Sequence, residues 1–253
     1  MKKKIPIVSA ISAIVVIVAL ITVAVIAMKN SDKTDPPADE TYTVTDMNGN
    51  TVVVSGSEIK DKLTKAGKLL RKDGKTVVAV VNGREIKADD LNIARMSIAL
   101  SGSDYVSTEK ELLDIVIKDY VIEDYVSENG YVYEAEKEDL TSSEKEDDLQ
   151  EYITSSGLTK AEYTELRLRN RKKNKIYSQY LKQVVGPLLS GEIKLDDEKA
   201  IELLAKYQEQ IETGDPEQMD WDVINECSPE LVELFTQHLV DEADVVIYED
   251  KLN

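Results

Sequence analysis

The feature that most constrains this chain is a long uncharged apolar run, Ile5–Met28, which follows the three lysines Lys2–Lys4. A helix of about 20 apolar residues crosses the hydrocarbon core of a bilayer, so residues 1–28 are predicted to form a transmembrane signal-anchor. Because lysines before such a helix stay in the cytoplasm, we expect the rest of the chain on the extracytoplasmic side. The alternative is a cleaved signal peptide, with Val25 and Ala27 at the small-residue positions of its cleavage site and the body secreted.

The remaining chain divides into three stretches by composition. Residues 29–41 are polar and contain two adjacent prolines, which is typical of a linker. In residues 42–74, short β-branched runs flank Asn48-Gly49 and a helical pattern follows, which predicts a small hairpin-helix unit. Residues 75–253 begin with a second hairpin that turns at Asn82-Gly83 and continue with mostly helical spacing.

Helical patterns dominate residues 75–253, so the fold class is predicted to be mainly α with short β-hairpins. Ser57 is expected to cap the first helix of the body, and Gly186-Pro187 and Ser228-Pro229 are expected to end one helix and begin another. Three later helices are expected to begin at capping boxes, which are Thr108–Glu111, Thr141–Glu144 and Thr159–Glu162. The predicted helices cover residues 57–70, 88–100, 108–127, 141–156, 159–184 and 196–213, with a last helix from 228 and a closing strand at 243–248.

The composition excludes several classes of site. A formal net charge of -18 argues against a nucleic-acid partner, because phosphate binding needs clustered Lys and Arg. Cys227 is the single cysteine, so neither an intramolecular disulfide nor a cysteine-rich zinc site is possible. His238 is the single histidine, and its apolar neighbours in sequence predict a partly buried structural role. No GxxxxGK[ST] loop for ATP occurs. We therefore expect no enzyme activity, no metal and no cofactor.

Two charged segments stand out within the body. Glu134–Asp148 is strongly acidic, and a solvated face is a simpler explanation for it than a calcium site. Arg167–Lys175 holds the only basic cluster. We expect it to pair with the neighbouring acidic helix or to lie in water, although contact with anionic lipid or a cell-wall polymer is an alternative.

Three segments within residues 75–253 follow one another in an order that is similar to that of a known protein family. They are VAVVNGREI (78–86), ELLDIVIKDYVIEDYVSENG (111–130) and LTKAEYTELRLRNRKKNKIYSQYL (158–181). This order resembles the N-terminal chaperone domain of SurA-type and PrsA-type extracytoplasmic foldases, which is related to the peptide-binding arm of trigger factor. The likeness covers residues 76–181, and ADVVIY (243–248) is similar to the returning strand of such proteins. The resemblance implies a SurA-like helical chaperone domain, over residues 75–253, in a single-pass protein of a bacterial cell membrane.

The chain departs from that family where many members carry a parvulin-type prolyl isomerase domain. Such a domain uses paired histidines, whereas the stretch between Gly186 and Asp241 holds one histidine and is too short. The resemblance therefore implies a chaperone that binds unfolded exported polypeptides without ATP and without its own isomerase. The alternative is an envelope or spore-coat assembly protein that uses the same fold to bind one dedicated partner, and a homodimer is possible in either case.

Apolar and tyrosine side chains at helical spacing are the candidates for contact with such clients, because they combine a large apolar area with polar tips. They are Met96, Leu100, Tyr120, Tyr125, Tyr163, Tyr177 and Tyr180.

Overall fold

The computed structural model describes residues 41–45, 51–100, 108–136, 156–213 and 216–252. The predicted transmembrane segment, nearly all of the linker, most of the acidic segment and nearly all of the predicted helix at 141–156 lie outside these ranges. Within the described ranges, no helix combines the length and the apolarity needed to cross a membrane.

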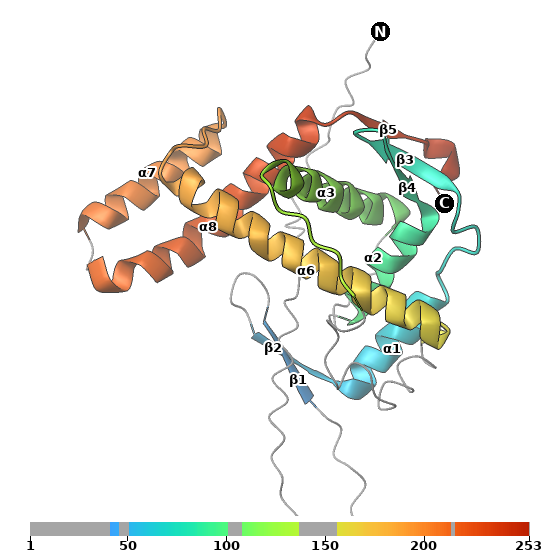
Figure 1. Cartoon of the computed structure of the whole chain (residues 1–253). Coiled ribbons are helices and arrows are strands. Elements are labelled where there is room, and N and C mark those ends of the chain that lie inside the picture. The colour runs from blue at the N-terminus through green and yellow to red at the C-terminus, as the bar shows by residue number, and fades with distance from the viewer. Residues whose placement is uncertain (1–40, 46–50, 101–107, 137–155, 214–215, 253) are drawn as a thin grey trace, which may run out of the picture.

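The described part is mainly helical with short strands, which confirms the predicted class (Figure 1). The elements are β1 (Thr41–Thr45), β2 (Thr51–Ser55), α1 (Gly56–Gly67), β3 (Val77–Val81), β4 (Arg84–Lys87), α2 (Ala88–Leu100), α3 (Glu109–Glu128), α6 (Lys160–Leu189), α7 (Glu198–Thr213), α8 (Pro216–Glu242), β5 (Val245–Ile247) and a 3-10 turn, η3 (Glu249–Lys251). Strands β1 and β2 pair as the first predicted hairpin, although its turn lies outside the described residues.

Local sequence sets where several helices begin. Thr108 with Glu111 and Thr159 with Glu162 form the predicted capping boxes, in which each Thr hydroxyl accepts from the Glu N–H and each Glu carboxylate accepts from the Thr N–H. Helix α1 begins earlier than predicted, because Ser55 rather than Ser57 is its cap. Ser55 has a glutamate three residues later to complete the box, whereas Ser57 has none.

Two proline positions expected to bound helices lie inside them. Helix α6 continues through Pro187 to Leu189, and helix α8 runs through Pro229. A proline inside a helix removes one backbone hydrogen bond. In both helices a large apolar side chain within two residues after the proline is fully buried, namely Leu188 in α6 and Leu231 in α8. Burial of these side chains offsets the lost hydrogen bond, so both helices extend beyond their predicted ends.

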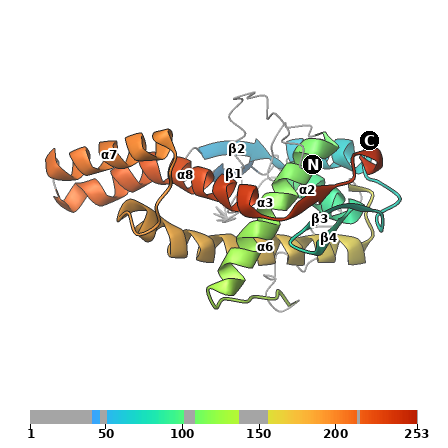
Figure 2. The ribbon, with the colours of Figure 1, turned by 90° about the horizontal axis from the view of Figure 1, so that it is seen from above.

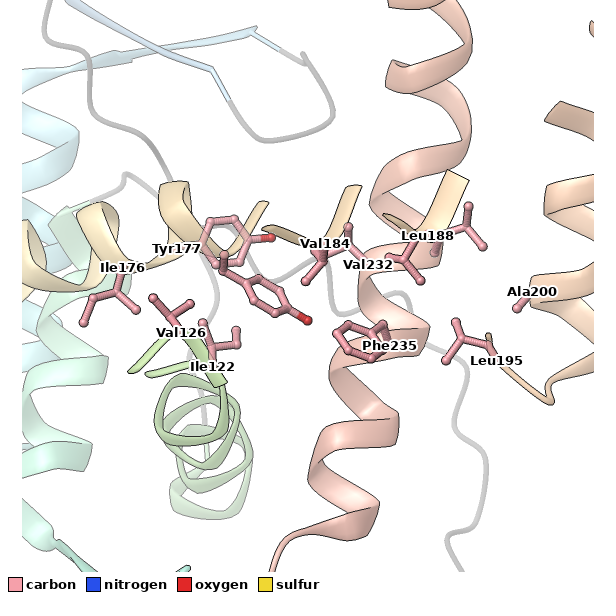
Figure 3. Packing of buried hydrophobic residues seen from close by; sticks show 12 residues of the cluster. Ile122, Val126, Ile176, Tyr177, Val184, Leu188, Leu195, Ala200, Val232 and Phe235 are labelled. Carbon is pink, nitrogen blue, oxygen red and sulfur yellow. The ribbon is translucent and has the colours of Figure 1, made fainter. Parts of the chain in front are cut away.

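Helix α6 crosses the molecule and joins two hydrophobic cores (Figures 1 and 2). Its N-terminal half packs Tyr163 and Leu166 against α1 and α2, so α1 of the predicted hairpin-helix unit shares a core with the larger body. Its C-terminal half packs Tyr180 and Val184 against α3 and α8 in a second core, which Figure 3 shows. A third core fills the space between the sheet and helices α2 and α3.

The predicted C-terminal strand is present as β5, and it pairs with β3 to complete a three-stranded antiparallel sheet of order β4-β3-β5. The β3–β4 turn is Asn82-Gly83, and both residues have the positive φ that such a two-residue hairpin turn requires, 50° and 78°. Strand β5 is shorter than predicted because the N–H of Ala243 still donates to the carbonyl of Leu239 in α8, at 3.1 Å.

Candidate polypeptide-binding surface

Four of the seven predicted client-binding side chains are core residues, which corrects the expectation that they line an accessible surface. Met96 and Tyr163 are each 2% exposed and pack between α1, α2 and α6. Tyr177 and Tyr180 lie in the core between α3, α6 and α8, and burial raises the pKa of both hydroxyls. These side chains fill the interior because each lies on the face of its helix that meets a neighbouring helix. Leu100 is the last residue of α2, and its side chain is outside the described part.

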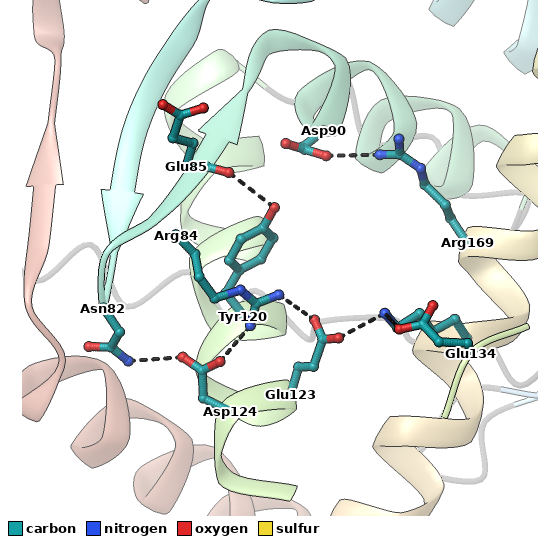
Figure 4. A network of polar contacts seen from close by, with 10 residues as sticks. Asn82, Arg84, Glu85, Asp90, Tyr120, Glu123, Asp124, Glu134 and Arg169 are labelled. Atoms are coloured by element: carbon teal, nitrogen blue, oxygen red, sulfur yellow. Dashed lines mark hydrogen bonds and ion pairs between the residues drawn. The ribbon is translucent and has the colours of Figure 1, made fainter. Parts of the chain in front are cut away.

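The remaining two tyrosines are half-buried. The guanidinium of Arg84 lies 4.4 Å from the centre of the Tyr120 ring, and the Tyr120 hydroxyl lies 3.4 Å from the carbonyl oxygen of Glu85 (Figure 4). Burial raises the pKa of Tyr120 to about 12. The ring of Tyr125 packs edge-on against those of Tyr180 and Phe235, with centroids 5.7 and 5.5 Å apart. Tyr120 therefore takes part in a polar network, whereas Tyr125 lies at the margin of the α3–α6–α8 core.

Basic side chains of the α6 cluster form ion pairs with carboxylates of the same chain. Lys172 pairs with Glu123 of α3 and with Glu134, at 2.9 and 2.6 Å. Lys173 pairs with Asp119 at 2.7 Å, and Arg169 pairs with Asp90 of α2, as Figure 4 shows. These three cations therefore pair with carboxylates, but not chiefly with those of the acidic segment as expected. Among these partners only Glu134 belongs to that segment, and the others lie on α2 and α3.

His238 is more exposed than predicted, because 47% of its side chain is accessible. Its Nε2 atom lies 3.5 Å from a carboxylate oxygen of Glu242, one helical turn later, and its ring is near Phe235. In the described part of the chain, no group of His, Cys, Asp and Glu side chains is arranged to hold a metal ion.

The sequence patterns did not indicate an exposed arm, and the structure contains one. Helices α7 and α8 run antiparallel and project from the rest of the molecule (Figures 1 and 2). Two helices alone cannot cover each other's apolar faces completely. In α7, Ala200 is fully buried, Leu204 and Tyr207 are half-buried, and Ile201 is 59% exposed. The arm therefore presents partly exposed apolar side chains to solvent.

The C-terminal half of α6 and the α6–α7 connection also carry partly exposed apolar side chains. The partly exposed side chains there pack against the same core as those of α7. We call the whole set the arm surface, and it comprises Leu181, Val185, Leu189, Ile193, Ile201, Leu203, Leu204 and Tyr207. Exposed apolar side chains gathered over one core are a common feature of protein-binding surfaces.

The arm is also strongly acidic. Residues 192–242 contain sixteen Asp and Glu, three Lys and no Arg. One of these lysines is used within the arm, because Lys199 of α7 pairs with Glu230 of α8 and its pKa is raised by that hydrogen bond. Carboxylates around a partly exposed apolar face keep a protein soluble and disfavour self-association through that face.

No protein-family model, no curated protein and no solved structure matches the chain.

Proposed function

We propose that this chain is a membrane-anchored extracytoplasmic chaperone that binds unfolded exported polypeptides through the arm surface, without ATP and without isomerase activity. The observation that carries the proposal is the projecting α7–α8 arm with its partly exposed apolar side chains. Binding there would need no chemical step, since burial of apolar area supplies about 25 cal/mol for each Å² removed from water.

The apolar run Ile5–Met28 supports the location of this activity, because it predicts an anchor that holds the body beside the membrane. A tether raises the local concentration of the binding surface near newly exported chains. Weak affinity for each client is then sufficient, and weak affinity is what a half-buried apolar surface provides.

The proposal is tested by suppression of aggregation. The full-length chain in detergent micelles is mixed with a chemically unfolded client, light scattering is followed without ATP, and a second, unrelated client is used in parallel. Suppression of both clients near equal molar ratio is the expected result. Suppression of neither would reject the chaperone and leave the dedicated assembly partner as the explanation.

A matched pair of variants places the activity on the arm. Ile201→Ser removes an apolar side chain of α7 that is 59% exposed, and Leu69→Ser removes a comparably exposed one, at 49%, just after α1. Burial of the Ile201 side chain by a client is worth about 1 kcal/mol, or roughly fivefold in affinity. We expect Ile201→Ser to need about fivefold more protein for equal suppression, and Leu69→Ser to match the unmodified chain.

A further inference from the structure

The two edges of the three-stranded sheet are covered to different degrees. At the β4 edge, side chains cover the backbone groups that point away from β3. The Tyr120 hydroxyl lies against the carbonyl of Glu85 (Figure 4). The N–H of Lys87 donates to the carboxylate of Asp90 at 2.7 Å. Uncovered strand edges are templates for pairing with another chain, and proteins usually protect them. The β4 edge is protected in this way.

The β5 edge is open. The N–H of Asn82 donates to the carbonyl of Asp244 at 2.9 Å, and the N–H of Tyr248 donates to the carbonyl of Val78 at 3.0 Å. Backbone groups in an antiparallel pair alternate between facing the partner strand and facing away. The N–H and C=O groups of Val245 and Ile247 therefore point away from β3. Within the described ranges, no other backbone segment forms a hydrogen bond with these four groups.

The side chains beside this edge are apolar and exposed. Val246, which lies opposite Val80 in the register, is 45% exposed, and Tyr248 is 39% exposed. An added strand would bury these two side chains and would satisfy the four open backbone groups. In strand addition, the backbone hydrogen bonds provide affinity and the alternate side chains provide specificity for the added sequence.

The charges around β5 favour one kind of added strand. Glu242, Asp244, Glu249 and Asp250 are exposed at its two ends. Lys251 is the one Lys or Arg among residues 242–252, and it pairs with Asp250 at 3.0 Å. The buried guanidinium of Arg71 also lies near this end, where it donates to the Lys251 carbonyl at 2.7 Å. If a second copy added its own β5 in antiparallel register, Asp244 of one copy would approach Glu249 and Asp250 of the other. Like charges at such a contact disfavour it, whereas a strand rich in Lys or Arg would be attracted.

We infer that the β5 edge binds an extended, cationic segment of another polypeptide, with alternating apolar and basic residues, as a fourth strand of the sheet. This inference rests on the sheet and its charges, not on the arm surface, so the two proposals stand or fall separately.

The test uses the full-length chain in detergent micelles and two short peptides, one of alternating Val and Lys and one of alternating Val and Glu. Amide hydrogen exchange of the segment containing β5 is measured by mass spectrometry with and without each peptide. We expect the cationic peptide to slow exchange in that segment and to bind at least about tenfold more tightly than the acidic one. Equal binding of the two peptides would overturn the charge preference, and binding without slower exchange at β5 would overturn the site.

Two variants at one exposed position keep the test independent of folding defects. Val246→Lys and Val246→Glu place opposite charges at the same exposed position. We expect the lysine variant to bind the cationic peptide about tenfold more weakly and the glutamate variant to bind it at least as well as the unmodified chain. Equal loss in both would overturn the inference. Slow exchange at β5 before any peptide is added would also overturn it, because another part of the chain or a second copy would then cover the edge.

Discussion

The ion pair between Arg71 and Glu109 should be among the most costly polar contacts to break. The Arg71 and Glu109 side chains are 7% and 8% exposed, and Arg71 Nη1 lies 2.9 Å from a Glu109 oxygen. The same guanidinium donates to the carbonyl of Lys251 at 2.7 Å and pairs with Asp73, while Arg71 N–H donates to the side chain of Asn92. One residue thus links the α1–β3 connection to α2, to the start of α3 and to the C-terminal turn.

Breaking one partner of a buried pair typically costs about 3–5 kcal/mol, because the other charge stays buried without compensation. Glu109→Leu leaves Arg71 with Asp73 and the Lys251 carbonyl, so we expect a loss near the lower end, about 3 kcal/mol. Arg71→Met should cost a similar amount. The double variant should lose at least ~2 kcal/mol less than the sum of the two, because an apolar pair replaces the ionic pair.

The free energy of unfolding is measured by urea titration of the full-length chain, followed by helical circular dichroism. Glu165→Ala is the control, because it removes an exposed pair with Arg169 in which the two side chains are 60% and 42% exposed. Exposed pairs contribute little, so this change should stay within about 0.5 kcal/mol. Strictly additive losses for Arg71→Met and Glu109→Leu, each no larger than in the control, would refute the reasoning.

Two further predictions concern α1 and α6. A Cβ at Gly67 would lie 2.3 Å from the backbone oxygen of Ser156. Gly67→Ala should therefore lower the free energy of unfolding by about 1–3 kcal/mol, and an unchanged or higher value would contradict the packing at α1. The hydrogen bond from Thr159 holds the pKa of Glu162 below its usual value of 4.5. The pKa of Glu162 is lower in the folded than in the unfolded chain, so this stabilisation is complete above about pH 4.5 and is lost as the pH falls through the folded pKa. Glu162→Gln should therefore have a smaller free energy of unfolding than the unmodified chain at pH 7. The difference in free energy of unfolding between the two should shrink on acidification.

Local features of the fold were predictable from sequence because neighbouring residues determine them. The capping boxes Thr108–Glu111 and Thr159–Glu162 and the Asn82-Gly83 turn depend on a few adjacent residues, and all three form as predicted. The cap of α1 was missed although a signal was present, since a glutamate follows Ser55 by three residues. The continuation of α6 past Pro187 was not predictable, because it depends on the burial of Leu188 against distant helices.

The candidate surface was harder to predict than the helices that carry it. Met96 and Ile201 lie on similar helical patterns, yet Met96 is covered by α1 and α6 while Ile201 is exposed on the arm. A periodic apolar pattern identifies the face of a helix that seeks burial. It does not state how many neighbours cover that face, because those neighbours are distant in sequence. The exposure of α7 therefore follows from the arrangement of the helices in space, which has no local signature.

The most direct measurement of the central proposal is site-specific crosslinking of a client to the arm. A photo-crosslinking amino acid is placed at position 201 in one full-length variant and at position 69 in another, and each is irradiated with an unfolded client. Both positions carry exposed apolar residues in the native chain, so exposure alone does not distinguish them. The proposal predicts client adducts at position 201 and few at position 69. Equal adducts at both positions, or none at position 201, would contradict it.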